Sequence, residues 1–175
     1  MRFKFIVLIC SVTLFFGCNK TRKEEAVSVQ TNSNSKSSVL TVTDINKQRY
    51  RDFELDVAAI KIIENWKPYK EMALIVSNVK QANFTDLTDN TEVLHELISN
   101  LRYDIPSALK SSSILARIKV LETKLFKLES LVNLDTKTKN HLLIDVISFL
   151  ESFSNLNFQI NKKLERDSQN ISRPQ

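Results

Sequence analysis

Few residues in this chain have the types and spacing that chemistry requires, and the first of them are a glutamate and a histidine. Glu92 and His95 are three positions apart, so on a helix both side chains lie on one face and reach the same point. Glu-x-x-His pairs hold iron in di-metal helical bundles, which also need a second such pair and two more carboxylates. Thr138 stands where a second pair containing His141 would need its glutamate. We therefore interpret Glu92 and His95 as exposed helix residues and expect no metal site.

A second set of residues would suit haem. Methionine and histidine side chains are ligands of haem iron, and Met72 is the only methionine after residue 1. Because most helical proteins contain a methionine and a histidine by chance, Met72 is interpreted as a core residue. No cofactor is expected. A bundle that binds haem, a metal or another ligand between its helices, in the periplasm, stays the alternative function.

Catalytic motifs that depend on glycine are absent, since Gly17 is the only glycine. Phosphate-binding loops and dinucleotide fingerprints need glycines so that backbone N–H groups can approach the anion, and nucleophile elbows need them beside the serine. Ser111, Ser112 and Ser113 have no base at a suitable spacing. The chain is therefore not expected to be an enzyme. A body without glycine favours helices joined by turns that avoid positive φ.

A short apolar stretch behind a basic start occupies the beginning of the sequence. Arg2 and Lys4 precede residues 5–16, which are dominated by apolar side chains. This stretch is shorter than the roughly 20 residues that span a bilayer. Its length and flanks are typical of the core of a signal peptide, and it ends in Gly17 and Cys18.

The apolar run that ends in Gly17-Cys18 resembles the lipobox of bacterial lipoproteins. The resemblance implies that residues 1–17 are a lipoprotein signal peptide, that cleavage occurs before Cys18, and that diacylglycerol is joined to the Cys18 thiol. At about 0.8 kcal/mol per buried CH₂, several palmitate-type chains hold a protein on a membrane. An ordinary cleaved signal or an N-terminal anchor helix is the alternative. The expected location is the bacterial cell envelope, at the outer membrane, on its periplasmic face or at the cell surface.

Three segments further along are similar to small helical lipoproteins of Bacteroidota, and of flavobacteria in particular. They are Ile105-Pro106, residues 120–124 (VLETK) and residues 154–165 (SNLNFQINKKLE). This resemblance implies a compartment and a helical fold, and it implies no reaction.

Composition divides the rest of the chain into a tether, a helical domain and a tail. Residues 18–42 contain Cys18 and a run rich in Ser, Thr, Asn and charge, which cannot bury enough apolar surface to offset the entropy of ordering. We expect a disordered tether there. Helical spacing of apolar residues extends over 43–168, and residues 169–175 are expected to be a disordered tail.

The domain is predicted to be all-α, an antiparallel up-and-down bundle of about four to five helices. Thr43 or Asp44 caps the first helix, and Pro68 ends it because proline lacks the N–H that a helix needs. Asp135 is a candidate cap for the last helix. The predicted helices are 43–67, 68–82, 91–102, one that starts after Pro106 and ends at Val132, and one that follows residues 133–135.

Apolar residues mark the face that each helix should bury. Those of the last two helices alternate in steps of four and three, which predicts antiparallel packing of one helix on the other. The first helix should bury Tyr50, Phe53, Val57, Ile60 and Ile63; the second carries Met72, Leu74, Ile75, Val76 and Val79; the third should bury Val93, Leu94, Leu97, Ile98 and Leu101; the fourth Ile114, Ile118, Leu121, Leu125, Leu128 and Val132; the fifth Leu143, Val146, Leu150, Phe153, Asn157, Ile160 and Leu164.

Three polar or aromatic residues stand out against this pattern. Asn157 lies in the apolar stripe of the fifth helix, and we expect partial exposure near the helix end, because burying an unpaired amide costs about 1–3 kcal/mol. Trp66 and Tyr69 flank the helix break at Pro68. Aromatic residues at such a junction either form a patch that binds a partner or fill the end of the bundle.

Charge gives a weaker indication of partners. The whole chain has a net charge of +5 and a sequence pI near 9.2, which suggests an anionic partner. Loss of residues 1–17 would remove Arg2 and Lys4 and lower the charge to +3, so no nucleic acid is expected. The sequence predicts an envelope lipoprotein with a binding or structural helical domain, anchored in the membrane by Cys18 and engaging a protein partner.

Overall fold

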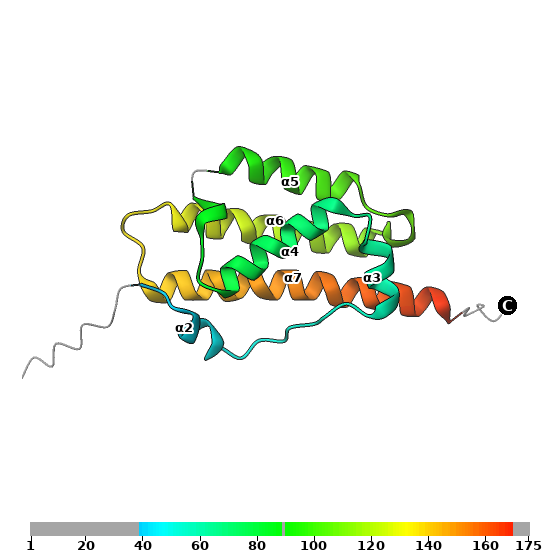
Figure 1. The fold of residues 1–175 in the computed structure, drawn as a ribbon, viewed down its shortest axis with the longest axis horizontal. Coiled ribbons are helices and arrows are strands. Elements are labelled where there is room, and N and C mark those ends of the chain that lie inside the picture. The colour runs from blue at the N-terminus through cyan, green and yellow to red at the C-terminus, as the bar shows by residue number, and fades with distance from the viewer. Residues whose placement is uncertain (1–38, 89, 170–175) are drawn as a thin grey trace, which may run out of the picture. The chain divides into compact units, whose positions relative to one another are not determined.

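A computed structural model describes residues 39–88 and 90–169, all within the unit Ser35–Gln175 (Figure 1). The predicted signal peptide, Cys18, most of the predicted tether and residues 170–175 lie outside the described residues. Over the two described ranges the chain is helical, without a strand, which confirms the all-α prediction. The elements are α2 (Val42–Asn46), α3 (Val57–Ile63), α4 (Lys67–Lys80), the 3₁₀ turn η2 (Thr85–Leu87), α5 (Thr91–Tyr103), the 3₁₀ turn η3 (Ser107–Leu109), α6 (Ser112–Val132) and α7 (Lys139–Ser168).

Helices α4 to α7 alternate in direction along the chain, as the up-and-down prediction requires (Figure 1). Helix α7 contacts α2, α3, α4, α6 and η3, whereas α5 packs on α4 and α6. The longest helix is therefore also the one against which most of the other elements pack. None of the helices in the described ranges combines the length and the apolar character that a membrane span requires.

Helices α6 and α7 form the centre of the core through the predicted apolar stripes. On α6, Ile114, Ile118, Leu121, Leu125 and Leu128 are fully buried. Helix α7 buries the middle of the predicted stripe, from Val146 to Ile160, whereas Leu143 and Leu164 at its ends are only partly buried. It also buries a second stripe, which contains Leu142, Phe149 and Leu156. The second stripe is needed because α7 is covered from more than one side, whereas a two-helix seam buries only one stripe.

The prediction of one helix over residues 43–67 is wrong, because two short helices, α2 and α3, are separated there by a non-helical stretch. Helix α2 begins earlier than expected, with Thr41 as its N-cap and Asp44 in a capping box, and it ends at Asn46. Residues 47–56, called segment 47–56 below, are not helical and run along α7 (Figure 1). The face predicted from helical spacing therefore does not exist, and Val57 and Ile60 are exposed instead of buried.

Contacts at α2 extend the ordered domain to residues before the predicted boundary at 43. Leu40 is buried in the core. Lys139, the first residue of α7, pairs with Asp44 at 2.7 Å. The hydrogen bonds from Lys139 and Thr41 hold the pKa of the Asp44 carboxyl well below its usual value, so the carboxylate is ionised when it caps α2 and pairs with α7.

Helix ends in this domain are closed without glycine. Helix α4 begins at Lys67 with Pro68 in its first turn, as predicted. At its other end Ala82 adopts a φ of 54°, and the N–H groups of Ala82 and Asn83 donate to the carbonyls of Val79 and Asn78, both at 2.9 Å. This is a Schellman closure. The expectation that turns would avoid positive φ fails here, because these two hydrogen bonds offset the roughly 1–2 kcal/mol that a Cβ costs in this conformation.

Serine and threonine cap the two longest helices. The Ser111 hydroxyl accepts from the N–H of Ile114 at the start of α6, and Thr138 accepts from the N–H of His141 at the start of α7. The predicted cap at Asp135 is therefore wrong, because the connection between the two helices continues to residue 138. The turn η3 likewise separates Pro106 from the start of α6.

Candidate functional site

Trp66 and Tyr69 do not form a surface patch, because both rings are buried in the core. Their ring centroids are 5.3 Å apart, and Tyr69 stacks on Phe153 of α7 at 5.4 Å. Trp66 is the N-cap of α4 and Tyr69 lies in its first turn, and both rings face inward and fill the space between α4 and α7. The indole N–H of Trp66 has no acceptor among the described residues, and this side chain contributes apolar contact area instead of a polar bond. The partner-binding alternative for Trp66 and Tyr69 is wrong.

Asn157 is buried, contrary to the expected partial exposure, and both its carbonyl oxygen and its amide nitrogen are hydrogen-bonded. Its carbonyl oxygen accepts from the Tyr69 hydroxyl at 2.6 Å, and its amide donates to the carbonyl of Phe53 at 3.0 Å. Burial raises the pKa of Tyr69 well above its ordinary value, so the hydroxyl stays protonated and can donate. One side chain of α7 thereby links α4 to segment 47–56.

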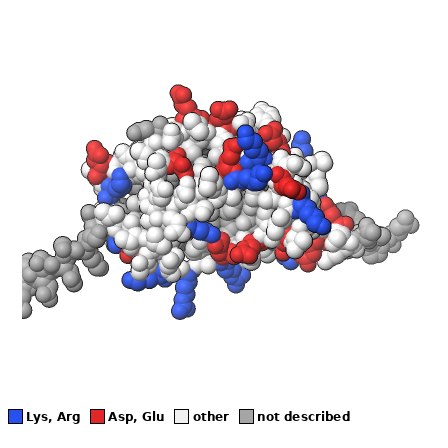
Figure 2. Space-filling model, in the orientation of Figure 1, with Lys and Arg blue, Asp and Glu red and all other residues white. Residues whose placement is uncertain are grey.

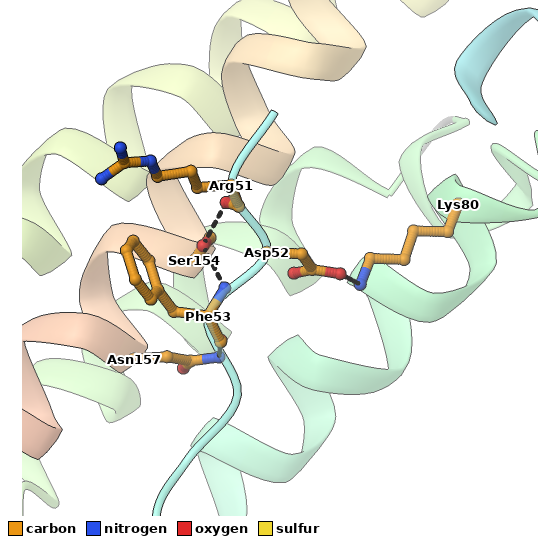
Figure 3. A network of polar contacts seen from close by, with 6 residues as sticks. All are labelled: Arg51, Asp52, Phe53, Lys80, Ser154 and Asn157. Atoms are coloured by element: carbon orange, nitrogen blue, oxygen red, sulfur yellow. Dashed lines mark hydrogen bonds and ion pairs between the residues drawn. The ribbon is translucent and has the colours of Figure 1, made fainter. Parts of the chain in front are cut away.

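Two further side chains of α7, Ser154 and Asn161, bind the same segment, and Figure 3 shows the contacts of Ser154. The Ser154 hydroxyl donates to the carbonyl of Arg51 at 2.6 Å and accepts from the N–H of Phe53 at 2.7 Å. Asn161 donates to the carbonyl of Glu54 at 2.8 Å and accepts from the N–H of Asp56 at 3.0 Å. Ser154, Asn157 and Asn161 are spaced three and four apart, so they lie in one row on α7. We call them the α7 polar row.

The polar row explains why segment 47–56 is not helical. Five of its backbone groups, between Arg51 and Asp56, are bonded to side chains of α7, and a helix would withdraw the same groups into its own ladder. Ser154, Asn157 and Asn161 therefore have a structural role, since they attach segment 47–56 to α7. Lys80 of α4 adds an ion pair to Asp52 at 2.5 Å from the other side of the segment (Figure 3).

The residues considered for metal or haem are placed apart. Glu92 and His95 are exposed on α5, and the His95 ring stacks on Phe126 of α6 with centroids 4.1 Å apart. Met72 is fully buried, and His141 is exposed in the first turn of α7. Within the described ranges, no three His, Cys, Asp or Glu side chains lie together as metal ligands would.

The structure offers a groove between α4 and α5 that the sequence did not predict. It has a volume of about 470 Å³, and its apolar lining is Leu74 and Ile75 of α4 with Val93, Leu94 and Leu97 of α5. Leu74 and Val93 are each 62% exposed. Val93 was predicted to be buried. The buried residues of α5 are Leu94, Leu97, Ile98 and Leu101, and this spacing leaves position 93 beside the core face. The sequence therefore contained an indication that Val93 is exposed, because Val93 lies one position before the regular 94-97-98-101 spacing.

Charged side chains line the same groove. Glu71, Asp86 and Glu96 contribute three carboxylates, and Lys67 contributes one ammonium group. Lys67 lies 3.7 Å from the Glu71 carboxylate, one turn further along α4. In Figure 2, acidic side chains project from the edge that α5 forms in Figure 1, and basic ones project from the edge near α2. We call the pair of walls and these charged residues the α4–α5 groove.

Comparisons with known protein families, with characterised proteins and with solved structures find no match for this chain.

The burial of Asn157 makes a prediction for stability. Asn157→Ala removes the acceptor of the Tyr69 hydroxyl and the donor to the Phe53 carbonyl, and unpaired buried groups cost about 1–3 kcal/mol each. We expect the free energy of unfolding, measured by urea denaturation, to fall by about 2 kcal/mol or more. Asn155→Ala is the matched control, because Asn155 is exposed on the same helix, and it should change stability by less than about 0.5 kcal/mol. Equal effects of the two substitutions would contradict the assigned role of Asn157.

Proposed function

We propose that this protein is a lipid-anchored component of the bacterial cell envelope whose helical domain binds a protein partner and catalyses no reaction. The observation that carries the binding role is the α4–α5 groove, whose lining includes two large apolar side chains that are exposed, Leu74 and Val93. The anchoring role rests on the lipobox-like sequence that ends at Cys18. Each half of the proposal has its own test.

Exposed apolar residues are common on protein surfaces when they are scattered singly. Leu74 and Val93 differ from that situation, since they come from two helices and line one groove together with Ile75, Leu94 and Leu97. Burial of a valine or leucine side chain contributes about 1.5–3 kcal/mol. Ile75, Leu94 and Leu97 are already buried, so a partner that covers this groove would gain about 2–4 kcal/mol from the exposed parts of Leu74 and Val93. This supports binding as the function of the groove.

An anchor at Cys18 would place this groove near a membrane. The sequence between Cys18 and Leu40 has the composition of a flexible linker, for which a root-mean-square reach of about 25 Å is expected. A domain on such a linker meets partners in or close to the same membrane at a high effective concentration. The proposal is therefore a tethered recruiter of envelope proteins.

The lipid anchor is tested by fatty-acid labelling in cells that make the protein. We expect an alkyne fatty acid to be incorporated into the protein and Cys18→Ala to abolish the labelling, because the acylated thiol is lost. Cys10→Ala is the matched control and should keep the label, since residue 10 lies in the part that cleavage removes. Labelling that survives Cys18→Ala would disprove the anchor at this residue.

The binding role is tested by photocrosslinking in the same cells. Benzoylphenylalanine replaces Val93 in the groove and, as the control, Val57 on α3, which is 73% exposed and therefore at least as accessible. We expect a discrete protein adduct from position 93 and none from position 57. The same adducts from both positions, or none from position 93, would contradict a partner in the groove.

A further inference from the structure

We infer that the occupant of the α4–α5 groove is an amphipathic α-helix of another protein, with apolar residues on one face and lysine or arginine along its sides. This inference rests on the proposed binding function and adds the chemistry of the partner. Three features of the groove support it: its walls, its apolar lining and the sign of the charge around it.

The walls of the groove favour a helix over an extended peptide. The apolar part of the lining consists of side chains of α4 and α5, whose backbone groups are engaged within the two helices apart from those of the terminal turns. An extended peptide would need backbone partners there, whereas a helix satisfies its own N–H and C=O groups and can bury one apolar face. Two adjacent helices therefore offer the groove into which a third helix packs its ridge of side chains.

The length of the walls sets the size of the contact. On α5 the lining extends from Val93 to Asn100 and is preceded by Asn90, which corresponds to about 15 Å at 1.5 Å per residue. About three turns of a partner helix match this length. Such a helix presents apolar residues at intervals of three and four to Leu74 on one side and Val93 on the other.

The charge of the lining selects a basic partner. Three carboxylates and one ammonium group face the groove, and the ammonium group of Lys67 is close to the Glu71 carboxylate. Asp86 already accepts a hydrogen bond from Asn78 at 2.7 Å, which leaves Glu71 and Glu96 as the most adaptable acidic groups. Lysine or arginine beside the apolar face of the partner would meet these carboxylates, and an acidic helix would be repelled.

The test uses a synthetic helix as the probe and the full chain as the receptor. Benzoylphenylalanine replaces Leu74 in the groove or Ile144 on α7. These residues are matched in exposure, at 62% and 63%, and Ile144 does not line the α4–α5 groove. The probe is a biotinylated helix with leucine on one face and lysine elsewhere, and a second helix has glutamate in place of every lysine. We expect the lysine helix to crosslink to position 74 about tenfold more than to position 144, and about tenfold more than the glutamate helix does.

A charge-neutralising variant separates electrostatic selection from apolar adhesion. Glu71→Gln combined with Glu96→Gln removes two carboxylates and leaves Lys67 without its ion-pair partner, so we expect crosslinking of the lysine helix at position 74 to fall about tenfold. Glu64→Gln with Glu151→Gln is the control, because both residues are exposed outside the groove, and it should leave the yield unchanged. Circular dichroism checks that each variant is folded.

Three results would overturn the inference. Equal crosslinking of the lysine and glutamate helices at position 74 would show that charge plays no part. Equal yields at positions 74 and 144 would show that the lysine helix does not dock in the groove. A covalent dimer through position 74 would show that a second copy of this chain fills the groove. In each case an adduct from position 93 in cells would still support a partner in the groove, so the two proposals fail separately.

Discussion

The α7 polar row is the interaction on which the arrangement of the N-terminal part of this domain depends. Ser154, Asn157 and Asn161 bind the backbone of segment 47–56, and Asn157 also accepts from Tyr69 of α4. Because side chains satisfy these backbone groups, the segment can cross α7 without forming a helix or a strand. The row thus links segment 47–56 and helix α4 to the long central helix, and it places α3 and the start of α4 where Trp66 fills the core.

The last two helices could be predicted from the sequence because their apolar residues repeat in steps of four and three, and such a pattern has one good solution. The first helix could not. Tyr50, Phe53 and Val57 are spaced as on a helix, yet the competing partners for the backbone of Phe53 lie about 100 residues away on α7. Local spacing contains no information about a side chain so distant in the sequence. The burial of Asn157 in an apolar stripe could not be predicted for the same reason, because its amide binds the carbonyl of the distant Phe53.

The groove was missed for a different reason. Predicting a core from periodicity assigns every apolar residue near the stripe to the interior, and Val93 was assigned in that way. Its exposure follows from the position of α5, which packs on α4 and α6 and buries only its 94-97-98-101 face. For Trp66 and Tyr69 the sequence left a partner patch and a buried position both open, and the structure shows both rings buried. Asn157 of the polar row accepts from the Tyr69 hydroxyl, so this ring can be buried without an unpaired polar group, whereas Trp66 is buried for its apolar contact area alone.

The most direct test of the polar row is amide hydrogen exchange of the full chain, measured at single-residue resolution. The N–H groups of Phe53 and Asp56 donate to Ser154 and Asn161, so we predict that both exchange as slowly as amides in the middle of α7, such as that of Leu156. The protection should persist under conditions in which the domain stays folded, since opening the segment requires breaking its contacts with α7. Exchange of Phe53 and Asp56 at the rate of an unstructured chain, while Leu156 is protected, would contradict the account.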